Sequence, residues 1–186
     1  MANSWQSLRI SGAWRRKVRF QPDDRGSFAE LWRASWVSDL PSAGGGMGQA
    51  NLSRSRQGVL RGLHVHRRQA DLWVVVEGHP YVALVDIRPV LERDGAPVRE
   101  TVDAAPGDAL YLPEGVAHGF YARDPITLVY FVTKEYDGTD EFGFAWDDRA
   151  AGVDWPTAEP ILSARDRDNP TLGELVEQIR QQTSVR

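Results

Sequence analysis

The sequence predicts an all-β protein: a jelly-roll barrel closed by one short C-terminal helix. Short segments that are apolar or alternate between apolar and polar residues cover most of the 186 residues. Turns containing Gly or Pro separate these segments, for example at residues 106–108 and 113–115. Apolar residues at helical spacing occur only near the C-terminus. Many short strands with a single terminal helix are typical of a jelly roll or a related barrel.

The predicted strands follow one another with short connections. The first part of the chain contains a strand at Val18–Phe20, a turn at residues 22–26, an alternating strand at Ser27–Trp32 and a Gly-rich loop at residues 42–46. Gln49–Arg56 then alternates as a half-buried strand does. Two apolar runs separated by Gly78 predict a hairpin of Leu72–Val76 with Tyr81–Val85. The remaining predicted strands are Thr101–Val102, Ala109–Leu112 and Ile126–Val132.

The predicted helix spans Thr171–Gln182. Its apolar residues are Leu172, Leu175, Val176 and Ile179, which lie on one face at helical spacing. Thr171 precedes Glu174 by three residues and is a suitable N-cap. The length fits one domain with a full core, so we expect a single domain over residues 1–186.

Composition excludes several classes of protein. A formal net charge of −4 gives no electrostatic footprint for nucleic acid. The absence of cysteine excludes disulfides, thiolate metal sites and a cysteine nucleophile. Residues 1–12 carry no apolar run typical of a signal peptide, and no stretch has the roughly 20 apolar residues of a membrane span. We therefore expect a soluble cytoplasmic protein without membrane or nucleic-acid partners.

Three of the four histidines are candidates for a functional site. His64 and His66 are two residues apart on a predicted strand, so their side chains share a face. His118 follows a Pro-Glu-Gly turn. A histidine that titrates near neutral pH can serve as a base or a metal ligand, and three in such segments favour a function over a place in the core. His79 follows Gly78 in a predicted turn and is expected to be solvated.

The spacing of these residues resembles the two motifs of the cupin superfamily of small jelly-roll barrels. Gly58, His64, His66, Asp71 and Gly78 match the first motif, with Asp71 where Glu is usual. The second motif is matched by Gly107, Pro113, Gly115 and His118. In metal-binding cupins, the equivalents of His64, His66, Asp71 and His118 are the ligands. Imidazole nitrogens with one carboxylate suit a divalent transition metal.

A longer resemblance covers nearly the whole chain. Matching segments occur in order at residues 24–30, 49–55, 58–64, 85–88, 112–120, 130–136, 141–148, 152–156 and 162–166. Among them are Asp24-Arg25-Gly26, Leu112-Pro113 with His118-Gly119-Phe120, and Gly152-Val153-Asp154-Trp155-Pro156. Together they resemble the dTDP-4-dehydrorhamnose 3,5-epimerase family. This resemblance implies a homodimer without a cofactor that acts on a dTDP-linked keto-sugar.

The resemblance also implies a role for each matched residue. In the family, a 4-keto-6-deoxyhexose loses the proton beside its ketone and regains a proton on the opposite face. This requires a base, a group that stabilises the enolate oxygen, and an acid across the ring. By the resemblance, His64 is the base, Asp166 orients its imidazole, and Tyr130 is the acid. Tyr136 stacks on the thymine ring, and the positions that hold nucleotide, diphosphate or sugar are Arg25, Glu30, Gln49, Asn51, Arg61, His118 and Glu141.

Each of these residues also has a plain structural interpretation. Arg25 lies in a polar turn, where a solvated charge is ordinary. Tyr130 lies in an apolar run that is also typical of a core strand. Asp166 belongs to a mixed-charge string at residues 165–168, which is typical of a solvated loop. Only the ordered match of the segments favours the functional roles.

One departure from the family affects the chemistry. The loop after His64 is short, and Asp71 occupies the position of a lysine that helps to hold the sugar ketone as it gains negative charge. Two unit charges about 4 Å apart interact by about 4 kcal/mol at an effective dielectric constant near 20. The exchange of lysine for aspartate reverses the sign of that term, so a carboxylate here opposes an enolate.

Three arrangements would remove this conflict. In the first, Asp71 points away or pairs with Arg67 or Arg68, and Arg61 stabilises the oxyanion. In the second, a protonated His66 replaces the lost cation and has Asp71 as its partner. In the third, His64, His66, Asp71 and His118 bind a metal, although a ligated His64 cannot also be the free base. We favour the first two.

The predicted function is epimerisation of a nucleotide-linked 4-keto-6-deoxyhexose at carbon 3, carbon 5 or both, by proton abstraction and reprotonation. Two alternatives remain at this point. The His-x-His, Asp and His spacing is also compatible with a metal-dependent isomerase or oxygenase. Asp71 is also compatible with a protein that binds a sugar nucleotide without turning it over.

Overall fold

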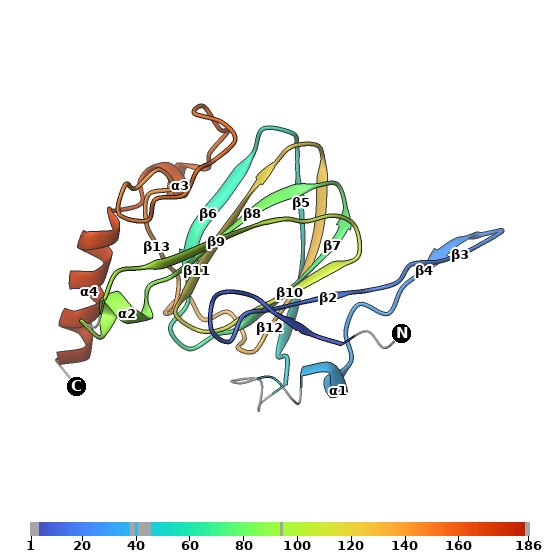
Figure 1. The fold of residues 1–186 in the computed structure, drawn as a ribbon, viewed down its shortest axis with the longest axis horizontal. Helices are drawn as coiled ribbons and strands as arrows, with labels where there is room; N and C mark the ends of the chain where they lie inside the picture. Colours follow the sequence, from blue (N-terminus) through green and yellow to red (C-terminus); the bar gives the residue numbers. More distant parts are fainter. Residues whose placement is uncertain (1–3, 38–39, 41–45, 94, 185–186) are drawn as a thin grey trace.

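The computed structural model describes residues 4–37, 40, 46–93 and 95–184, and two antiparallel sheets form its body (Figure 1). In spatial order, the six-stranded sheet contains β1 (Gln6–Ser7), β2 (Trp14–Lys17), β10 (Asp108–Leu112), β7 (Asp71–Glu77), β12 (Ile126–Val132) and β5 (Gln49–Ser55). The five-stranded sheet contains β13 (Phe142–Gly143), β6 (Leu60–Val65), β11 (Val116–Ala122), β8 (Pro80–Asp86) and β9 (Val98–Asp103). The predicted all-β, cupin-type barrel with a short C-terminal helix is confirmed.

A small hairpin of β3 (Gln21–Asp23) and β4 (Gly26–Phe28) projects from the barrel (Figure 1). The predicted turn lies at its tip. The strand predicted at Val18–Phe20 is wrong, and the strand predicted at Ser27–Trp32 is confirmed only for Ser27 and Phe28. Residues 18–20 connect β2 to β3 because the chain leaves the larger sheet after Val18 bonds to Gly107. The strand predicted at 27–32 ends at Phe28, since Leu31 and Trp32 both pack on the barrel surface instead of alternating.

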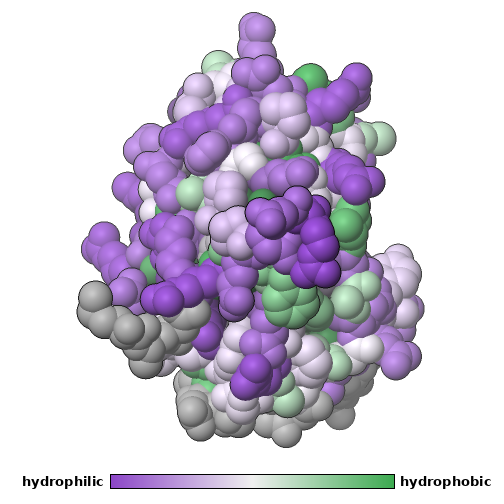
Figure 2. Space-filling view, turned by 90° about the vertical axis from the view of Figure 1, so that its right-hand side faces the viewer, coloured by the Kyte–Doolittle hydropathy of each residue, from purple (hydrophilic) through white to green (hydrophobic). Residues whose placement is uncertain are grey.

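The side of the molecule from which this hairpin projects is mostly hydrophilic, with a few apolar side chains near its middle (Figure 2). No helix among the described residues is long and apolar enough to cross a bilayer. The Gly-rich loop predicted at 42–46 lies outside the described residues, except for Gly46.

The hairpin predicted from the apolar runs at 72–76 and 81–85 is wrong. Both runs are strands, but β7 pairs with β10 and β12, whereas β8 pairs with β9 and β11. The chain therefore crosses from one sheet to the other at Gly78, which has φ +80°. A Cβ atom at this position would lie 2.3 Å from the backbone oxygen of Pro125, so the turn requires glycine. The apolar runs could not reveal this crossing, because each strand is buried on both faces.

Three apolar layers explain why the strands are buried on both faces. The first fills the space between the sheets and includes Trp73, Leu84 and Phe120. The second lies between the five-stranded sheet and α4 (Leu172–Ser184), which covers its outer face (Figure 1). The third covers the outer face of the six-stranded sheet with aromatic side chains of the N-terminal segment.

The C-terminal helix agrees with its prediction. Its four predicted apolar residues are all buried. Glu174 accepts hydrogen bonds from the backbone N–H and the hydroxyl of Thr171 at 2.8 Å, and Thr171 Oγ1 accepts from the Glu174 N–H at 3.3 Å, as in a capping box. Three four-residue helices were not predicted, and they are α1 (Ala34–Val37), α2 (Arg88–Leu91) and α3 (Ala164–Arg167).

A buried carboxylate connects the N-terminal strands to the barrel and carries a stability prediction. Asp108 is completely buried and accepts two hydrogen bonds of 2.8 Å from Arg15, while Lys17 lies 2.8 Å away. Burial alone would raise the pKa of Asp108, but its bonds to Arg15 and Lys17 outweigh burial and lower the pKa. We expect Asp108→Asn to lower the free energy of unfolding at pH 7 by about 2 kcal/mol, because the variant loses the hydrogen bonds between a buried carboxylate and the positive charges of Arg15 and Lys17.

Urea unfolding at several pH values measures this effect. The pKa of Asp108 is lower in the folded state than its unfolded value of about 4. Its contribution to stability is therefore complete above about pH 4 and is lost as the pH falls through the folded-state pKa. The difference between wild type and variant should therefore shrink towards pH 3. Asp23→Asn removes an exposed carboxylate paired with Arg25 and is the matched control, for which we expect no measurable change. An equal difference at pH 3 and pH 7 would contradict the role of the charge.

Candidate active site

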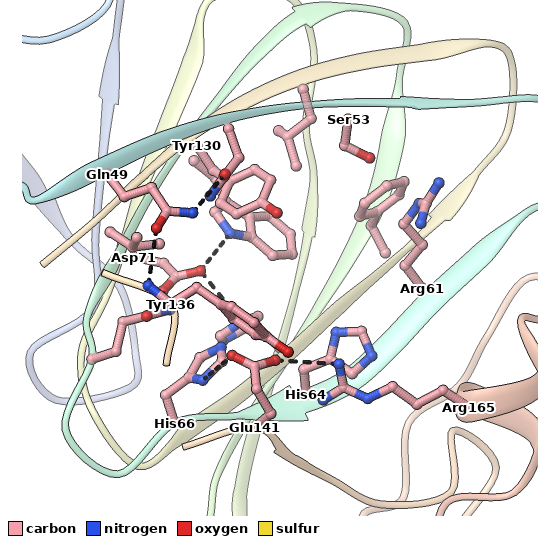
Figure 3. Close-up of a pocket in the computed structure, with 17 residues that line it drawn as sticks. Gln49, Ser53, Arg61, His64, His66, Asp71, Tyr130, Tyr136, Glu141 and Arg165 are labelled. Atoms are coloured by element: carbon pink, nitrogen blue, oxygen red, sulfur yellow. Dashed lines mark hydrogen bonds and ion pairs between the residues drawn. The ribbon is translucent and has the colours of Figure 1, made fainter. Parts of the chain in front are cut away.

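A pocket of about 430 Å³ opens between the two sheets (Figure 3). Alternate residues of the strands point into it, as the two-residue period of a strand requires. The pocket is lined by Gln49, Asn51 and Ser53 of β5, Arg61 and His64 of β6, Asp71 and Trp73 of β7, His118 and Phe120 of β11, and Leu128, Tyr130 and Val132 of β12, together with His66, Gln69, Tyr136, Glu141 and Arg165 from connections and α3. Ten of the residues predicted for substrate, catalysis or metal thus come together here.

His64 is held by a carboxylate from behind the pocket. Its Nε2 lies 2.5 Å from Oδ1 of Asp166, which is buried and lies 102 residues further along the chain. Ser163 caps α3 by accepting the N–H of Asp166 at 3.0 Å, and its hydroxyl donates to the other carboxylate oxygen at 2.9 Å. Burial alone would raise the pKa of Asp166, but the bonds from His64 and Ser163 lower it. A carboxylate held in this way orients the imidazole and leaves Nδ1 to exchange a proton with a bound molecule.

Tyr130 extends from β12, in the sheet opposite to that of His64 (Figure 3). Burial raises the pKa of Tyr130, and the negative charges of Asp71 and Glu141 raise it further against the opposing effect of Arg61. The phenol is therefore protonated at neutral pH. The pocket thus has a histidine–carboxylate pair on one wall and a proton donor on the other, which is an arrangement for moving protons to and from opposite faces of a molecule between them.

The structure places Asp71 in the pocket, so the arrangement in which it points away or pairs with Arg67 or Arg68 is wrong. Its carboxylate accepts hydrogen bonds from Gln69 Nε2 at 2.9 Å and Trp73 Nε1 at 3.2 Å. The backbone N–H groups of Arg67 and Arg68 donate to the Asp140 carboxylate, and the Arg68 guanidinium donates to Thr139 Oγ1 at 2.6 Å. The side chains that contact the Asp71 carboxylate are those of Gln69, Trp73 and His118, which all line the pocket.

His118 is the histidine nearer to Asp71, with 3.6 Å between Nε2 and Oδ2. His118 is buried, and this burial lowers its pKa to about 4 despite the nearby carboxylate. His66 has Nδ1 at 2.6 Å from the backbone oxygen of Asp140 and at 3.7 Å from Glu141 Oε1. The second arrangement, in which His66 replaces the lost cation with Asp71 as its partner, is therefore wrong in its choice of partner.

Two arginines supply positive charge at the rim. Arg61 donates to Ser55 Oγ at 2.9 Å, and its guanidinium faces the pocket. Arg165 of α3 lies 3.2 Å from Glu141 Oε2. Arg165 was not predicted as a site residue, although it directly precedes Asp166 in the mixed-charge string. Four further polar or aromatic lining residues were not predicted: Ser53, Gln69, Trp73 and Phe120. The two-residue period of a strand would have identified three of them, because Ser53, Trp73 and Phe120 lie two residues after Asn51, Asp71 and His118.

The entrance has a flat aromatic surface next to polar side chains. The Tyr136 side chain is highly exposed, and its backbone N–H donates to Gln49 Oε1 at 2.9 Å. Gln49 in turn donates to Asn51 Oδ1 at 2.9 Å, so the two amides are already oriented at the pocket wall. Such a surface suits a planar ring with hydrogen-bonding groups at its edge.

Arg25 and Glu30 are not among the residues that line this pocket. Arg25 lies in the turn of the projecting hairpin and pairs with Asp23 at 2.6 Å. Glu30 follows the hairpin and pairs with Arg33 at 2.5 Å. Both residues therefore lie outside this pocket of the single chain, and their role in substrate binding stays a prediction.

Comparison with known proteins identifies relatives over most of the chain. The model of a family described as dTDP-4-dehydrorhamnose 3,5-epimerase matches residues 7–174. The spore coat polysaccharide biosynthesis protein SpsL of Bacillus subtilis is 37% identical over 156 residues, which cover 80% of this chain and 97% of that protein. The dTDP-4-dehydrorhamnose 3-epimerase of Streptomyces niveus is 34% identical over 171 residues, which cover 90% of this chain and 83% of that protein.

Solved structures agree with these sequence matches. The epimerase RmlC from Legionella pneumophila, solved in complex with dTDP-4-keto-L-rhamnose, superposes with a TM-score of 0.79 at 29% identity. The match covers 91% of this chain and 93% of that chain. Similarity in fold and in sequence therefore extends over nearly the whole length.

Proposed function

This chain belongs to the dTDP-4-dehydrorhamnose 3,5-epimerase family, and we propose that His64 and Tyr130 carry out its reaction from opposite faces of the sugar. The chain is a carbohydrate epimerase that acts on a dTDP-linked keto-sugar, and this activity is favoured over that of a metal-dependent isomerase or oxygenase. The observation that carries the proposed roles is the 2.5 Å contact of His64 with buried Asp166, in a pocket whose other wall presents the protonated Tyr130.

The reaction begins with removal of a proton from the carbon next to the ketone. Nδ1 of His64 takes this proton, and the C–H electrons move into an enolate whose negative charge lies on the ketone oxygen. Asp166 stabilises the resulting imidazolium through Nε2, in the manner of a carboxylate that supports a histidine base. Tyr130 then donates its proton to the same carbon from the other face, and solvent restores both groups. The product differs from the substrate only in configuration.

The enolate oxygen requires positive charge or hydrogen-bond donors, and Arg61 is the cation that we assign to this task. Its guanidinium lines the pocket, and Ser55 fixes its Nε. Donors that are already in position where charge develops contribute several kcal/mol to catalysis, typically about 3 for one donor. Asp71 acts in the opposite direction, because its carboxylate lies in the same pocket.

The nucleotide binds at the entrance in this proposal. Tyr136 offers the exposed ring on which a thymine stacks, and Gln49 with Asn51 offers amide groups beside it. Arg165 and Glu141 form an ion pair at the rim, where a diphosphate can compete for the guanidinium. His118 completes the wall near the sugar.

We also propose a homodimer. Arg25 and Glu30 match family positions that hold substrate, yet both lie on or beside the hairpin that projects from its own barrel. The exposed Phe28 at the end of β4 gives this hairpin an apolar side chain to bury. A second chain that receives the hairpin would bring both residues to a pocket. The single-domain organisation and the cytoplasmic location stay predictions.

Proton NMR of dTDP-4-keto-6-deoxyglucose in heavy water tests the proposed function. With the full chain present, we expect the signal of the proton at carbon 3, carbon 5 or both to disappear as deuterium enters, followed by signals of an inverted product. The carbons that lose their signals identify the positions inverted. Binding of dTDP that raises the melting temperature, without any exchange, would instead support a protein that binds the sugar nucleotide without turnover.

A further inference from the structure

The Asp71 carboxylate is a buried negative charge in the wall of the active-site pocket (Figure 3). The residue is only 3% exposed. The two side chains that donate hydrogen bonds to it, Gln69 at 2.9 Å and Trp73 at 3.2 Å, are both neutral. Among the described residues, no lysine or arginine forms an ion pair with Asp71. A buried charge without an opposite charge is unfavourable, so the carboxylate favours a bound molecule that brings positive charge.

The two arginines that line the same pocket are held by other groups. Arg61 donates to Ser55 Oγ at 2.9 Å and to the backbone oxygen of Arg54 at 3.3 Å. Arg165 lies 3.2 Å from the carboxylate of Glu141. In the view of Figure 3, both arginines lie across the pocket from Asp71. The positive charges of the pocket are therefore separated from its buried carboxylate.

Two histidine rings add further hydrogen-bond acceptors beside this carboxylate. Nδ1 of His118 donates to the backbone oxygen of Val116 at 3.0 Å, and Nδ1 of His66 donates to that of Asp140 at 2.6 Å. Each neutral ring therefore keeps a lone pair on Nε2. Nε2 of His118 lies 3.6 Å from Oδ2 of Asp71, which is longer than a hydrogen bond. The two histidines and Asp71 each offer one atom within 4.8 Å of the others.

The spacing of these acceptors suits a primary ammonium group. Such a group has three N–H donors, a positive charge and no acceptor. Three charge-assisted hydrogen bonds of about 2.8 Å that leave one nitrogen in tetrahedral directions reach acceptors about 4.6 Å apart. The acceptors of the pocket lie at or below this separation, within 4.8 Å of one another. A hydroxyl has one donor and no charge, so it satisfies one acceptor only.

We propose that the substrate of this chain is an amino sugar whose ammonium group binds the Asp71 carboxylate, with His66 and His118 as neighbouring acceptors. The inference rests on the proposed function, because it takes a dTDP-linked 4-keto-6-deoxyhexose as the parent sugar. In that sugar, carbon 1 carries the diphosphate, carbon 4 is the ketone and carbon 5 carries the methyl group. The amine therefore replaces the hydroxyl at carbon 2 or carbon 3.

An ammonium group on the sugar also removes the conflict between Asp71 and an enolate. His118 is the cross-strand partner of His64, so the acceptors lie next to the proposed base. The ammonium group compensates the charge of Asp71 close to the carbon that loses its proton. The substrate thereby supplies the positive charge that the chain itself does not place at Asp71.

Calorimetry with three sugar nucleotides tests the substrate class without turnover, because none of them has a ketone. The first is dTDP-6-deoxyglucose, and the other two carry an amine in place of its hydroxyl at carbon 2 or carbon 3. At pH 7, we expect the full chain to bind one of the two amines at least about tenfold more tightly than the neutral sugar, as for a hydrogen bond between buried charges.

Asp71→Asn keeps the size of the side chain and should abolish this preference, so that the ratio of the dissociation constants falls to about one. Asp124→Asn is the matched control. It removes an exposed carboxylate that pairs with His79 outside the pocket, and the preference should stay as in wild type. A melting curve of each variant shows whether it is folded.

Two results would overturn the proposal: wild type that binds neither amine more tightly than the neutral sugar, or a preference that persists in Asp71→Asn. The proposed function is tested separately, by proton exchange on the keto-sugar. Exchange on dTDP-4-keto-6-deoxyglucose without any preference for an amine would overturn only the substrate class. A preference for an amine, without exchange on the 4-keto form of that sugar, would overturn only the proposed reaction.

Discussion

Replacement of His64 by Asn is expected to slow proton exchange at carbon 3 or 5 of the keto-sugar by about 10²–10⁴-fold, the usual contribution of a positioned base. The variant lacks an imidazole that can take up a proton from the substrate while Asp166 stabilises its charge. The rate of deuterium entry in heavy water, followed by proton NMR at saturating substrate, measures the step directly. The dissociation constant for dTDP should change little, since the proposed nucleotide residues lie at the pocket entrance.

His79→Asn is the matched control for this substitution. It removes an exposed histidine whose Nδ1 lies 2.7 Å from Asp124, outside the pocket. We expect wild-type exchange from this variant. Wild-type exchange from His64→Asn as well would assign the base to another residue and would remove the central step of the mechanism.

Replacement of Tyr130 by Phe is expected to separate proton exchange from inversion. His64 can still remove the proton and, after exchange with solvent, return deuterium to the same face. Delivery to the opposite face loses its acid, so inversion should fall by about 10²–10⁴-fold while deuterium entry falls much less. The measurement is the ratio of deuterated starting sugar to inverted product, read by proton NMR at several times.

Tyr81→Phe provides the comparison for Tyr130→Phe. It removes a hydroxyl that donates to the backbone oxygen of Asp154, at 2.8 Å and outside the pocket. The ratio of exchange to inversion should match wild type in this variant. An equal loss of exchange and inversion in Tyr130→Phe would show that Tyr130 already acts in the first proton transfer.

Local patterns in the sequence predicted the strands better than their partners. The two-residue period identified β5 as a strand, and the terminal helix follows from four apolar residues at helical spacing. The pairing of β7 and β8 was wrong because burial on both faces removes the alternation that would distinguish a hairpin from a crossing between sheets. Which strands become neighbours depends on contacts between distant segments, and no short window contains that information.

For the candidate site as well, the sequence predicted the residues better than it predicted their contacts. The resemblance to the family predicted eight of the residues that line the pocket, the cupin motif added His66 and Asp71, and Asp166 lies directly behind His64. Arg25 and Glu30 lie outside the pocket of the single chain, and a matched position does not say from which chain a residue reaches the site. Spacing alone also grouped His64 with the possible metal ligands. In the structure, Nε2 of His64 contacts Asp166, and His64 does not belong to the group formed by His66, Asp71 and His118.

The contact between His64 and Asp166 also has a consequence for the synthesis of the protein. Gly143 is the last strand residue of either sheet, and Asp166 comes 23 residues after it, in α3. Domains generally begin to fold from the N-terminus as the ribosome extends the chain. The nascent chain therefore contains all of its barrel strands before it contains the carboxylate that contacts His64. In the proposed mechanism, the pair of His64 and Asp166 is therefore completed only after all of the barrel strands have been translated.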